Sequence, residues 1–442
     1  MIYVKDLMEV CNGKLLCGDI NLPLNNFSKD TRLINKDDVY IGIKGESFDG
    51  NKFYKDALDK GASVCILDNI DEVDDKYKDK TIVKVEDTIK AIGLLAKYKR
   101  SLYNIPVVAV TGSVGKTSTK DMIAAVLSTE YKVLKTEANY NNHIGLPLTI
   151  LKLTDEDILV VEMGMNHFGE LSYLTDIARP TIGVITNIGT AHIGNLGSRE
   201  NIMKAKLEII EGLNGPLIIN NDNDIMHNNL DYIKSLNKVI TIGIDNKSDY
   251  MAKDINNSTF IVENNKITSP INNTAFIYNS LVAYVVGKLC NISIPNIQKG
   301  IKTNEFTSNR LEFKKTIIDD TYNSSLDAIK SSLEILEKEP SKRKIAVVGD
   351  ILEVGDYNKE IHENIGKLLL ENKLDIIVTI GTDTKYTDKY LEENNYTNYY
   401  HFNNESESHE KIKELLHEGD TVLFKGSHAI KLGNIVKYLM EE

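Results

Sequence analysis

Cysteine and proline are scarce in this chain of 442 residues, and no apolar run is long enough to cross a bilayer. The 4 cysteines form no CxxC pair and no zinc-ligand spacing, so we expect reduced thiols and a cytoplasmic protein. With 8 prolines, 28 glycines and 42% hydrophobic residues, the composition excludes collagenous and low-complexity chains. The first ten residues include acids and lack a continuous apolar stretch, so we expect no secretion signal there.

Basic residues are also fewer than acidic residues. The chain has 52 Lys and Arg against 64 Asp and Glu, which gives a formal net charge of -12. This balance disfavours nucleic acid or an anionic membrane as the main partner, but it allows a local basic pocket for a small anion. At roughly 150 residues per domain, the length predicts about three domains.

The hydrophobic pattern divides the chain into three parts. Residues 1–100 mix short apolar runs with turn residues and end in a helical stretch, TIKAIGLLAKYKRSLYN. Residues 101–308 begin with compact β-branched runs that alternate with helical segments, a pattern typical of buried parallel strands. Strands of this kind are expected at 107–110, 158–161, 184–186 and 217–219.

The remaining segments complete an α/β fold of three domains. Residues 221–278 are rich in Asn and Asp, and their pieces VITIGI and STFIVENN favour an antiparallel extension of the central domain over another crossover unit. In residues 309–442, the runs IAVVGD, IIVTIGT and VLFKGS predict a Rossmann-like, doubly wound sheet. Its functional residues are expected beyond the carboxyl ends of the strands. The segment 1–100 is predicted to form a smaller α/β domain.

A glycine loop follows the first strand of the central domain. The sequence VVAVTGSVGKTSTK places Gly112 and Gly115 between a strand and a helix, where backbone N–H groups can surround an anion. Lys116 adds a charge, and Thr117 is placed to offer its hydroxyl to Mg²⁺. A Walker A loop has four residues between its glycines, whereas this loop has two. The alternative is a glycine turn that only tightens the link between strand and helix, but Lys116 and Thr117 favour a site for a nucleoside triphosphate.

Three further residues could hold metal near this loop. Glu162 directly follows the strand ILVV, which suits an Mg²⁺ ligand, although it could also be a solvated acid at a strand end. His192 follows another strand, but a single histidine is usually structural. Lys206 lies in a helix with Ser198 as its expected N-cap, and by default it is a surface lysine. Carbamylation by CO₂ would turn it into an anionic ligand, a role that spacing alone does not indicate.

Several motifs in the right order resemble the Mur ligases, the ATP-dependent amide-forming enzymes of peptidoglycan precursor synthesis. The shortened loop TGSVGKTS is the form shared by Mur ligases and folylpolyglutamate synthases. The resemblance covers nearly the whole chain and is carried by SKDTR, GESFDGNKF, NYNNHIGLPLTIL, EMGMNHFGEL, NIGTAHIGNLGSRENIMKAKLEI, IIDDTYN and VVGDILEVGDYNKEIH.

The resemblance implies a central P-loop ATPase domain and a reaction through an acyl phosphate that releases ADP and phosphate. The partners it implies are small molecules, UDP-N-acetylmuramoyl-tripeptide and D-alanyl-D-alanine, with ATP, two Mg²⁺ ions and a carbamylated Lys206. It also implies a monomer with open and closed forms. The third residue of the tripeptide and the base that deprotonates the attacking amine stay open.

Site residues carry over from the family's motifs by position. The resemblance implies that catalysis depends on Lys116, His192 and Lys206. One ion would lie on Thr117 and Glu162, and the other on His192 and Lys206. The ATP site would comprise Gly112, Ser113, Val114, Gly115, Lys116, Thr117, Ser118, Asn279, Arg310 and Asp320. The substrate sites would comprise Asp30, Thr31, Arg32, Gly45, Glu46, Asp49, Gly50, Asn141, Asn142, Tyr322 and Asn323.

Some positions depart from the family pattern. Ala138 stands where glycine is common and His143 where Glu is frequent, and NSSLDA lacks the usual proline. His428 and Gly433 stand where Arg and Glu are frequent. Because these last two lie in the domain that would receive the amine, we expect them to bear on the dipeptide preference.

Three other functions compete with this interpretation. A ligase that adds glutamate to folate would not need the motifs DTR and GESFDG. A nucleotide switch or transport NTPase would need a base-reading NKxD element after the loop, whereas the string NKDD at 35–38 precedes it. A binding protein without catalysis is disfavoured because Lys116, Glu162, His192 and Lys206 are all present.

Overall fold

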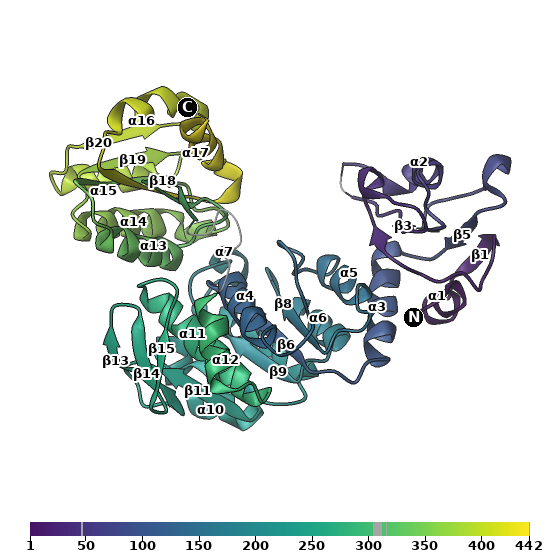
Figure 1. The fold of residues 1–442 in the computed structure, drawn as a ribbon. Coiled ribbons are helices and arrows are strands. Elements are labelled where there is room, and N and C mark those ends of the chain that lie inside the picture. Colours follow the sequence, from purple (N-terminus) through teal and green to yellow (C-terminus); the bar gives the residue numbers. More distant parts are fainter. Residues whose placement is uncertain (46, 304–311, 315, 442) are drawn as a thin grey trace.

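The computed structural model describes residues 1–45, 47–303, 312–314 and 316–441. Its described residues form three α/β parts in chain order, each built around a mainly parallel sheet (Figure 1). The predicted α/β fold is therefore confirmed. No helix in the described ranges combines the length and the apolar character that crossing a bilayer would require.

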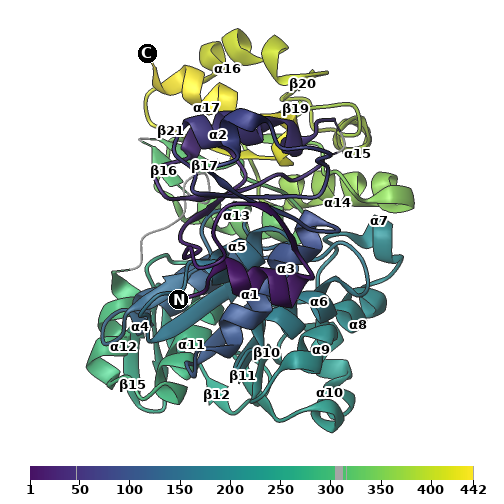
Figure 2. The same cartoon turned by 90° about the vertical axis from the view of Figure 1, so that its right-hand side faces the viewer.

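The N-terminal part is a five-stranded sheet in the order β1-β5-β4-β3-β2. Only the edge pair β1 and β5 runs antiparallel. Helix α3 packs against α1 on one side and against central helices on the other, so it joins the first two parts (Figure 2). The elements are α1 (Val4–Cys11), β1 (Lys14–Cys17), β2 (Phe27–Ser28), β3 (Val39–Ile41), α2 (Tyr54–Asp59), β4 (Val64–Leu67), β5 (Thr81–Lys84) and α3 (Thr88–Ser101).

The central part holds a seven-stranded, wholly parallel sheet in the order β12-β11-β10-β9-β6-β8-β7. A separate antiparallel sheet, β13-β14-β15, lies beside it. The strands are β6 (Val107–Thr111), β7 (Val133–Lys135), β8 (Ile158–Glu162), β9 (Ile182–Ile185), β10 (Leu217–Asn220), β11 (Val239–Gly243), β12 (Tyr250–Met251), β13 (Lys253–Asn256), β14 (Thr259–Val262) and β15 (Asn265–Thr268).

Helices cover both faces of the central sheet because successive strand side chains point to opposite faces. Val108 and Val110 of β6 pack with α4, α11 and α12, whereas Val107 and Ala109 pack in the cluster that includes α3, α5, α6 and α8. The helices are α4 (Lys116–Leu127), α5 (Gly145–Leu151), α6 (Glu170–Ala178), α7 (Ile193–Leu196), α8 (Arg199–Leu207), α9 (Asp224–Asn228), α10 (Leu230–Leu236), α11 (Thr274–Leu289) and α12 (Ile294–Lys302).

The expected antiparallel extension over 221–278 is only half correct. STFIVENN does fold antiparallel, with β14 paired to β15. VITIGI does not, because β11 pairs in parallel with β10 and completes another crossover unit through α9 and α10. Part of the Asn-rich composition reflects helix caps: Asn223 caps α9 and Asn273 caps α11 through their side chains.

The C-terminal part is a six-stranded sheet in the order β16-β17-β21-β18-β19-β20, parallel except for the edge pair β16 and β17. Helices α13 and α14 cover one face, and α16 and α17 cover the other. The elements are β16 (Glu312–Lys314), β17 (Ile317–Asp320), α13 (Leu326–Lys338), β18 (Arg343–Gly349), α14 (Asn358–Glu371), β19 (Ile376–Ile380), α15 (Lys385–Glu393), β20 (Tyr399–Phe402), α16 (His409–Leu415), β21 (Asp420–Lys425) and α17 (Gly433–Met440).

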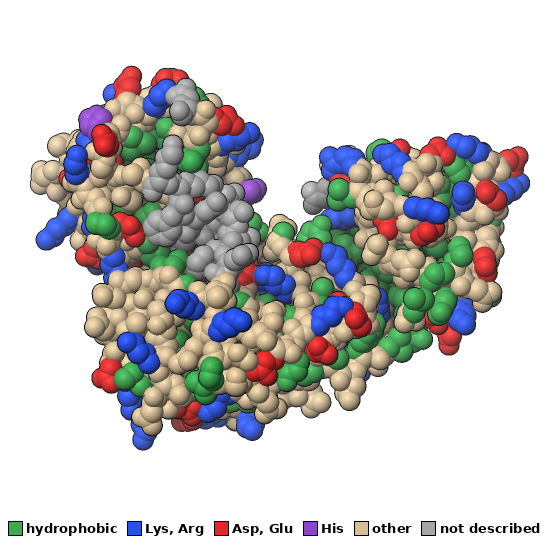
Figure 3. All heavy atoms as spheres, in the orientation of Figure 1, with side chains coloured by type: hydrophobic (Ala, Val, Ile, Leu, Met, Phe, Trp, Pro, Cys, Tyr) green, Lys and Arg blue, Asp and Glu red, His purple; other side chains and the backbone are tan. Residues whose placement is uncertain are grey.

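The two outer parts lie at opposite ends of the central part. Figure 3 shows a broad hollow between them, above the central part. The C-terminal part contacts the central part directly, since Glu334 of α13 accepts hydrogen bonds from Asn273 and Thr274 at the start of α11. The carboxyl ends of β6, β8 and β17 lead into loops that line one cavity.

Candidate active site

The loop between β6 and α4 has the backbone of an anion-binding turn. Gly112 and Gly115 have φ angles of 149° and 82°, in the region that favours glycine. A Cβ on Gly112 would lie 1.9 Å from the hydroxyl of Thr186, so no larger residue fits there. The helix α4 starts at Lys116, and the first N–H groups of a helix have no acceptor within it. This end of α4 can therefore receive a phosphate.

Asn187, which follows β9, braces the loop. The N–H of Ser113 donates to the carbonyl of Asn187 at 3.1 Å, and the N–H of Val114 donates to its side-chain oxygen at 2.9 Å. Lys116 folds back over the loop, and its Nζ donates to the carbonyl of Gly112 at 2.8 Å. Lys116 also lines the cavity, together with Ser113, Val114, Gly115 and Ser118.

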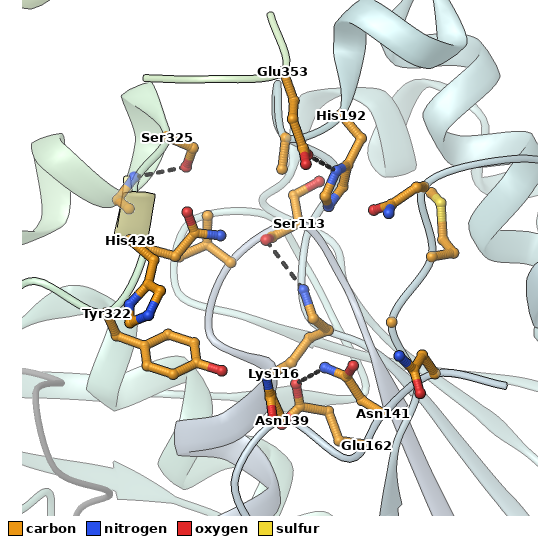
Figure 4. A pocket seen from close by; sticks show the side chains of 18 of the residues that line it. Ser113, Lys116, Asn139, Asn141, Glu162, His192, Tyr322, Ser325, Glu353 and His428 are labelled. Carbon is orange, nitrogen blue, oxygen red and sulfur yellow. Dashed lines mark hydrogen bonds and ion pairs between the residues drawn. The ribbon is translucent and has the colours of Figure 1, made fainter. Parts of the chain in front are cut away.

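Glu162 ends β8 beside this loop and is 1% exposed. Its carboxylate accepts the hydroxyl of Thr117 at 2.7 Å. It also accepts the amide of Asn141 at 2.8 Å (Figure 4). Within the described residues, no Lys or Arg forms an ion pair with it. A buried carboxylate with neutral partners is costly unless a cation neutralises it, so the pair Thr117 and Glu162 fits a metal ion.

His192 and Lys206 lie in the same electrostatic neighbourhood. Burial, and then the charge of Lys116, lower the pKa of His192, with a smaller contribution from Lys206 and an opposing one from Glu353. Lys206 is 1% exposed, and no residue in the described ranges forms an ion pair or hydrogen bond with its Nζ. Burial, and then Lys116, hold the pKa of Lys206 well below its usual range, which favours a neutral amine. Ser198 caps the helix of Lys206, as predicted.

The cavity has a volume of about 1240 Å³ and is lined by both the central and the C-terminal parts. From the central part, Asn141, Asn142, Glu162, His192 and Asn279 line it. From the C-terminal part, it is lined by Asp320, Tyr322, Asn323, Glu353, Lys425 and His428, among others. Figure 4 labels Tyr322, Glu353 and His428 among them. The chain therefore brings loops from two sheets around one space.

Asp320 anchors the C-terminal wall of the cavity. Its carboxylate pairs with Lys425 at 2.7 Å and accepts the hydroxyl of Ser332 at 2.6 Å. Lys425 also donates to the carbonyl of Asn323 at 2.7 Å, so one buried lysine ties the end of β21 to the loop after β17. The ring of Tyr322 lies 6.0 Å from the ring of His428 in this wall.

The predicted site residues of the N-terminal part lie in a different place. Asp30 pairs with Arg32 at 2.6 Å, and Thr31 starts a short 3-10 helix. Asp49 accepts the N–H of Asn51, and Gly50 donates to Ile43 at 3.0 Å. Together with Gly45, the described members of this set are not among the residues that line the cavity. Glu46 and Arg310 lie outside the described residues.

Sequence reasoning missed Glu353 and Lys425 as parts of the site. Both stand at or just beyond the carboxyl end of a strand, β18 for Glu353 and β21 for Lys425. That position could have drawn attention to both, and Glu353 also lies inside the motif VVGDILEVGDYNKEIH that carries the family resemblance. Nothing in the local sequence indicates that Glu353 reaches His192 of another domain.

Comparisons with known proteins agree over the whole chain. The family model described as Mur ligase middle domain matches residues 110–287, and the one described as Mur ligase, glutamate ligase domain matches residues 309–428. A Bacillus subtilis (strain 168) protein named UDP-N-acetylmuramoyl-tripeptide--D-alanyl-D-alanine ligase is 35% identical, covering 99% of this chain and 98% of that protein. A protein of the same name from Synechocystis sp. is 33% identical over 99% of this chain and 97% of its own length.

Solved structures agree as well. A crystal structure of MurF from Acinetobacter baumannii matches with a TM-score of 0.89 and 28% identity, covering 99% of this chain and 98% of that one. MurF ligase from Thermotoga maritima in complex with ADP matches with a TM-score of 0.81 and 27% identity, covering 95% and 97%.

Proposed function

This chain belongs to the Mur ligase family, and from that premise we propose that it joins D-alanyl-D-alanine to UDP-N-acetylmuramoyl-tripeptide, with ATP, in peptidoglycan precursor synthesis. The chain is an ATP-using ligase, like the relatives that match it end to end. The observation that carries the proposal is the shared cavity. The glycine loop, buried Glu162 and the loops of the C-terminal sheet all line the same space.

The reaction requires two steps because a carboxylate is a poor electrophile. A carboxylate oxygen of the tripeptide attacks the γ-phosphorus of ATP, the bond to the ADP oxygen breaks, and an acyl phosphate forms. The neutral amine of the dipeptide then attacks the acyl carbon, loses a proton, and expels phosphate. In the first step two anions meet, and Lys116 at the start of α4 offsets their repulsion.

In this proposal, residues of the central part would hold two Mg²⁺ ions. Thr117 and Glu162 would hold one ion. The burial of Glu162 without a cationic side-chain partner supports this assignment. His192 and a carbamylated Lys206 would hold the other, and the lowered pKa of Lys206 supports this because CO₂ reacts with a neutral amine. Bound ions would neutralise the charge that moves between the phosphates and the carboxylate.

The remaining predicted residues receive roles in binding. Asn279 would contact adenine, and Asn141 and Asn142 would contact the acyl substrate beside the loop. Tyr322 and Asn323 would line the path of the dipeptide amine. The UDP end of a long, extended substrate would bind far from the chemistry, at Asp30 to Arg32 and Gly45 to Gly50 in the N-terminal part. Closure of the outer domains would keep water from the acyl phosphate.

Two further properties belong to the proposal. The four cysteines are free, which supports a place in the reducing cytoplasm. A monomer, the state that the family resemblance implies, is part of the proposal, and size-exclusion chromatography with light scattering would test it.

Release of ADP by the purified protein tests the function. We expect sustained ADP release, over many turnovers, to require UDP-N-acetylmuramoyl-tripeptide and D-alanyl-D-alanine together, with one ADP and one phosphate per amide formed. Tripeptides ending in lysine and in meso-diaminopimelate should be compared, because the third residue is open. ATP turnover independent of both substrates would favour a nucleotide switch, and turnover with folate and glutamate would favour the other ligase.

A further inference from the structure

Glu353 and His192 meet across the boundary between the C-terminal and central parts. Glu353 lies in the loop after β18, and His192 is the residue before α7. The Nδ1 atom of His192 is 2.8 Å from a carboxylate oxygen of Glu353, at the edge of the cavity that holds Lys116 (Figure 4). The two residues are 161 positions apart in the sequence, so only the fold brings them together.

The two loops are shaped to lie against each other. The N–H of Gly194 donates to the carbonyl of Glu353 at 3.2 Å, and the hydroxyl of Tyr357 donates to the carbonyl of Gly197 at 2.6 Å. A Cβ on Gly194 would lie 2.7 Å from the nitrogen of Gly355, so glycine is needed for this approach. These two contacts, one between backbone groups and one from the Tyr357 hydroxyl, position the loop at 352–357 independently of the Glu353 carboxylate.

Both partners adopt a backbone conformation that is uncommon for residues with a Cβ. The φ angle is 64° at His192 and 63° at Glu353. Such strain persists only where surrounding contacts enforce it, and it is concentrated at functional sites. Here it turns two side chains from different domains toward each other.

The contact decides which imidazole nitrogen can bind another group. When the carboxylate accepts a hydrogen bond from Nδ1–H, the lone pair of the neutral ring lies on Nε2. Within the described part of the chain, His192 forms its side-chain contact through Nδ1, and no residue there bonds to Nε2. Metal-binding histidines commonly donate their other N–H to a carboxylate in this way, which fixes both the tautomer and the ring orientation.

We propose that Glu353 is a positioning residue that prepares His192 for the second metal ion, and that the C-terminal domain supplies it. The ion site would then be complete only when the loop at 352–357 is docked on α7. Domain docking and metal binding are thereby linked through one hydrogen bond. The proposal rests on the proposed function, specifically on the assignment of an ion to His192.

A purely structural ion pair between the domains is the competing explanation. The side chain of Glu353 is 55% exposed, and exposed ion pairs contribute little to stability. If the pair only held the domains together, its loss would act like the loss of any other docking contact. Tyr357, whose hydroxyl also crosses the boundary, provides the matched comparison.

The test uses Mn²⁺ as the probe ion. Mn²⁺ is titrated into the full-length protein in the presence of a non-hydrolysable ATP analogue, and its binding is measured by electron paramagnetic resonance. We expect Glu353→Ala to weaken the binding of one of the two Mn²⁺ ions by about 10- to 100-fold and to leave the affinity for the other unchanged. Glu353→Gln, whose amide oxygen can still accept from Nδ1, should weaken it less. Tyr357→Phe should stay within about twofold of the parent protein. In turnover assays, excess Mg²⁺ should restore kcat in Glu353→Ala but not in His192→Ala.

The outcomes separate this proposal from the function it rests on. Wild-type Mn²⁺ binding in Glu353→Ala, with an ion lost in His192→Ala, would overturn the positioning role alone. An equal loss in Tyr357→Phe and Glu353→Ala would also overturn it, because docking would then explain the effect. Two ions retained in His192→Ala would overturn the second metal site together with this inference.

Discussion

The hydroxyl of Thr117 donates to the carboxylate of Glu162 at 2.7 Å, which joins the first turn of α4 to the last residue of β8. Both side chains are 1% exposed, and the amide of Asn141 occupies the other carboxylate oxygen. This arrangement places a negative charge directly beside the glycine loop. The first prediction tests that charge.

Glu162→Gln should keep the size of the side chain and an acceptor for Thr117, but remove the charge that a metal ion needs. We expect kcat for ADP release to fall by about 100-fold or more, the scale of losing one electrostatic group in an active site. The thermal midpoint should change little. Glu211→Gln, at an exposed position of the central part, is the matched control and should turn over normally. Full activity in Glu162→Gln would remove the first ion from the mechanism.

Lys206→Ala should be nearly inactive, because the variant cannot form a carbamate. Added short-chain carboxylic acids are expected to restore part of the activity by filling the space with an anionic oxygen ligand. Lys204→Ala, on the exposed side of the same helix, should behave like the parent protein. The carbamate itself can be detected by ¹³C NMR after exposure to labelled CO₂. Absence of a carbamate signal, with full activity in Lys206→Ala, would contradict the second ion site.

Lys99 of α3 makes unfolding free energy depend on pH. Burial lowers the pKa of Lys99 to about 8, and its Nζ donates to the carbonyl of Leu151. Since the unfolded chain binds the proton up to a higher pH, this burial penalty is complete below pH 8 and disappears as pH rises toward the ordinary lysine pKa. The stability of the parent relative to Lys99→Met should therefore increase above pH 8, by at most about 3 kcal/mol. Denaturant titrations across this range measure it, and a pH-independent difference would be inconsistent with the lowered pKa.

His428 provides a test of dipeptide recognition. It lies beside Tyr322 in the C-terminal wall of the cavity, at a position where the family resemblance leads us to expect Arg. A guanidinium can bind a carboxylate through two hydrogen bonds, so His428→Arg should lower the KM for D-alanyl-D-alanine several-fold. The KM for ATP should not change and serves as the internal control. A shift in the KM for ATP alone would place His428 outside the dipeptide path.

Local sequence predicted the central features of the fold and of the nucleotide loop. The glycines, Lys116 and the strand and helix around them lie within a few residues of one another, so their geometry follows from short-range rules. The same holds for the carboxyl-end position of Glu162 and for the cap at Ser198. The prediction for β11 was wrong because nothing in its Asn-rich local sequence indicates the direction in which the strand runs. Its parallel pairing with β10 decides that direction.

Contacts between segments that are distant in the sequence could not be predicted from it. Spacing does not reveal that Lys206 is buried beside Lys116, and only the family resemblance indicated its role. The pairing of Glu353 with His192 depends on how two domains dock, and the bond between Lys425 and Asp320 depends on the register of β17 and β21. The exact domain boundaries and the UDP site at Asp30 to Gly50 stay predictions.

The most direct measurement of the central claim follows one oxygen atom. If the tripeptide carboxylate attacks ATP and the resulting acyl phosphate is captured by the dipeptide amine, one carboxylate oxygen leaves in the phosphate. With ¹⁸O at both oxygens of that carboxylate, each phosphate released should carry one ¹⁸O atom, detectable by mass spectrometry. Phosphate free of label during amide formation would contradict the account.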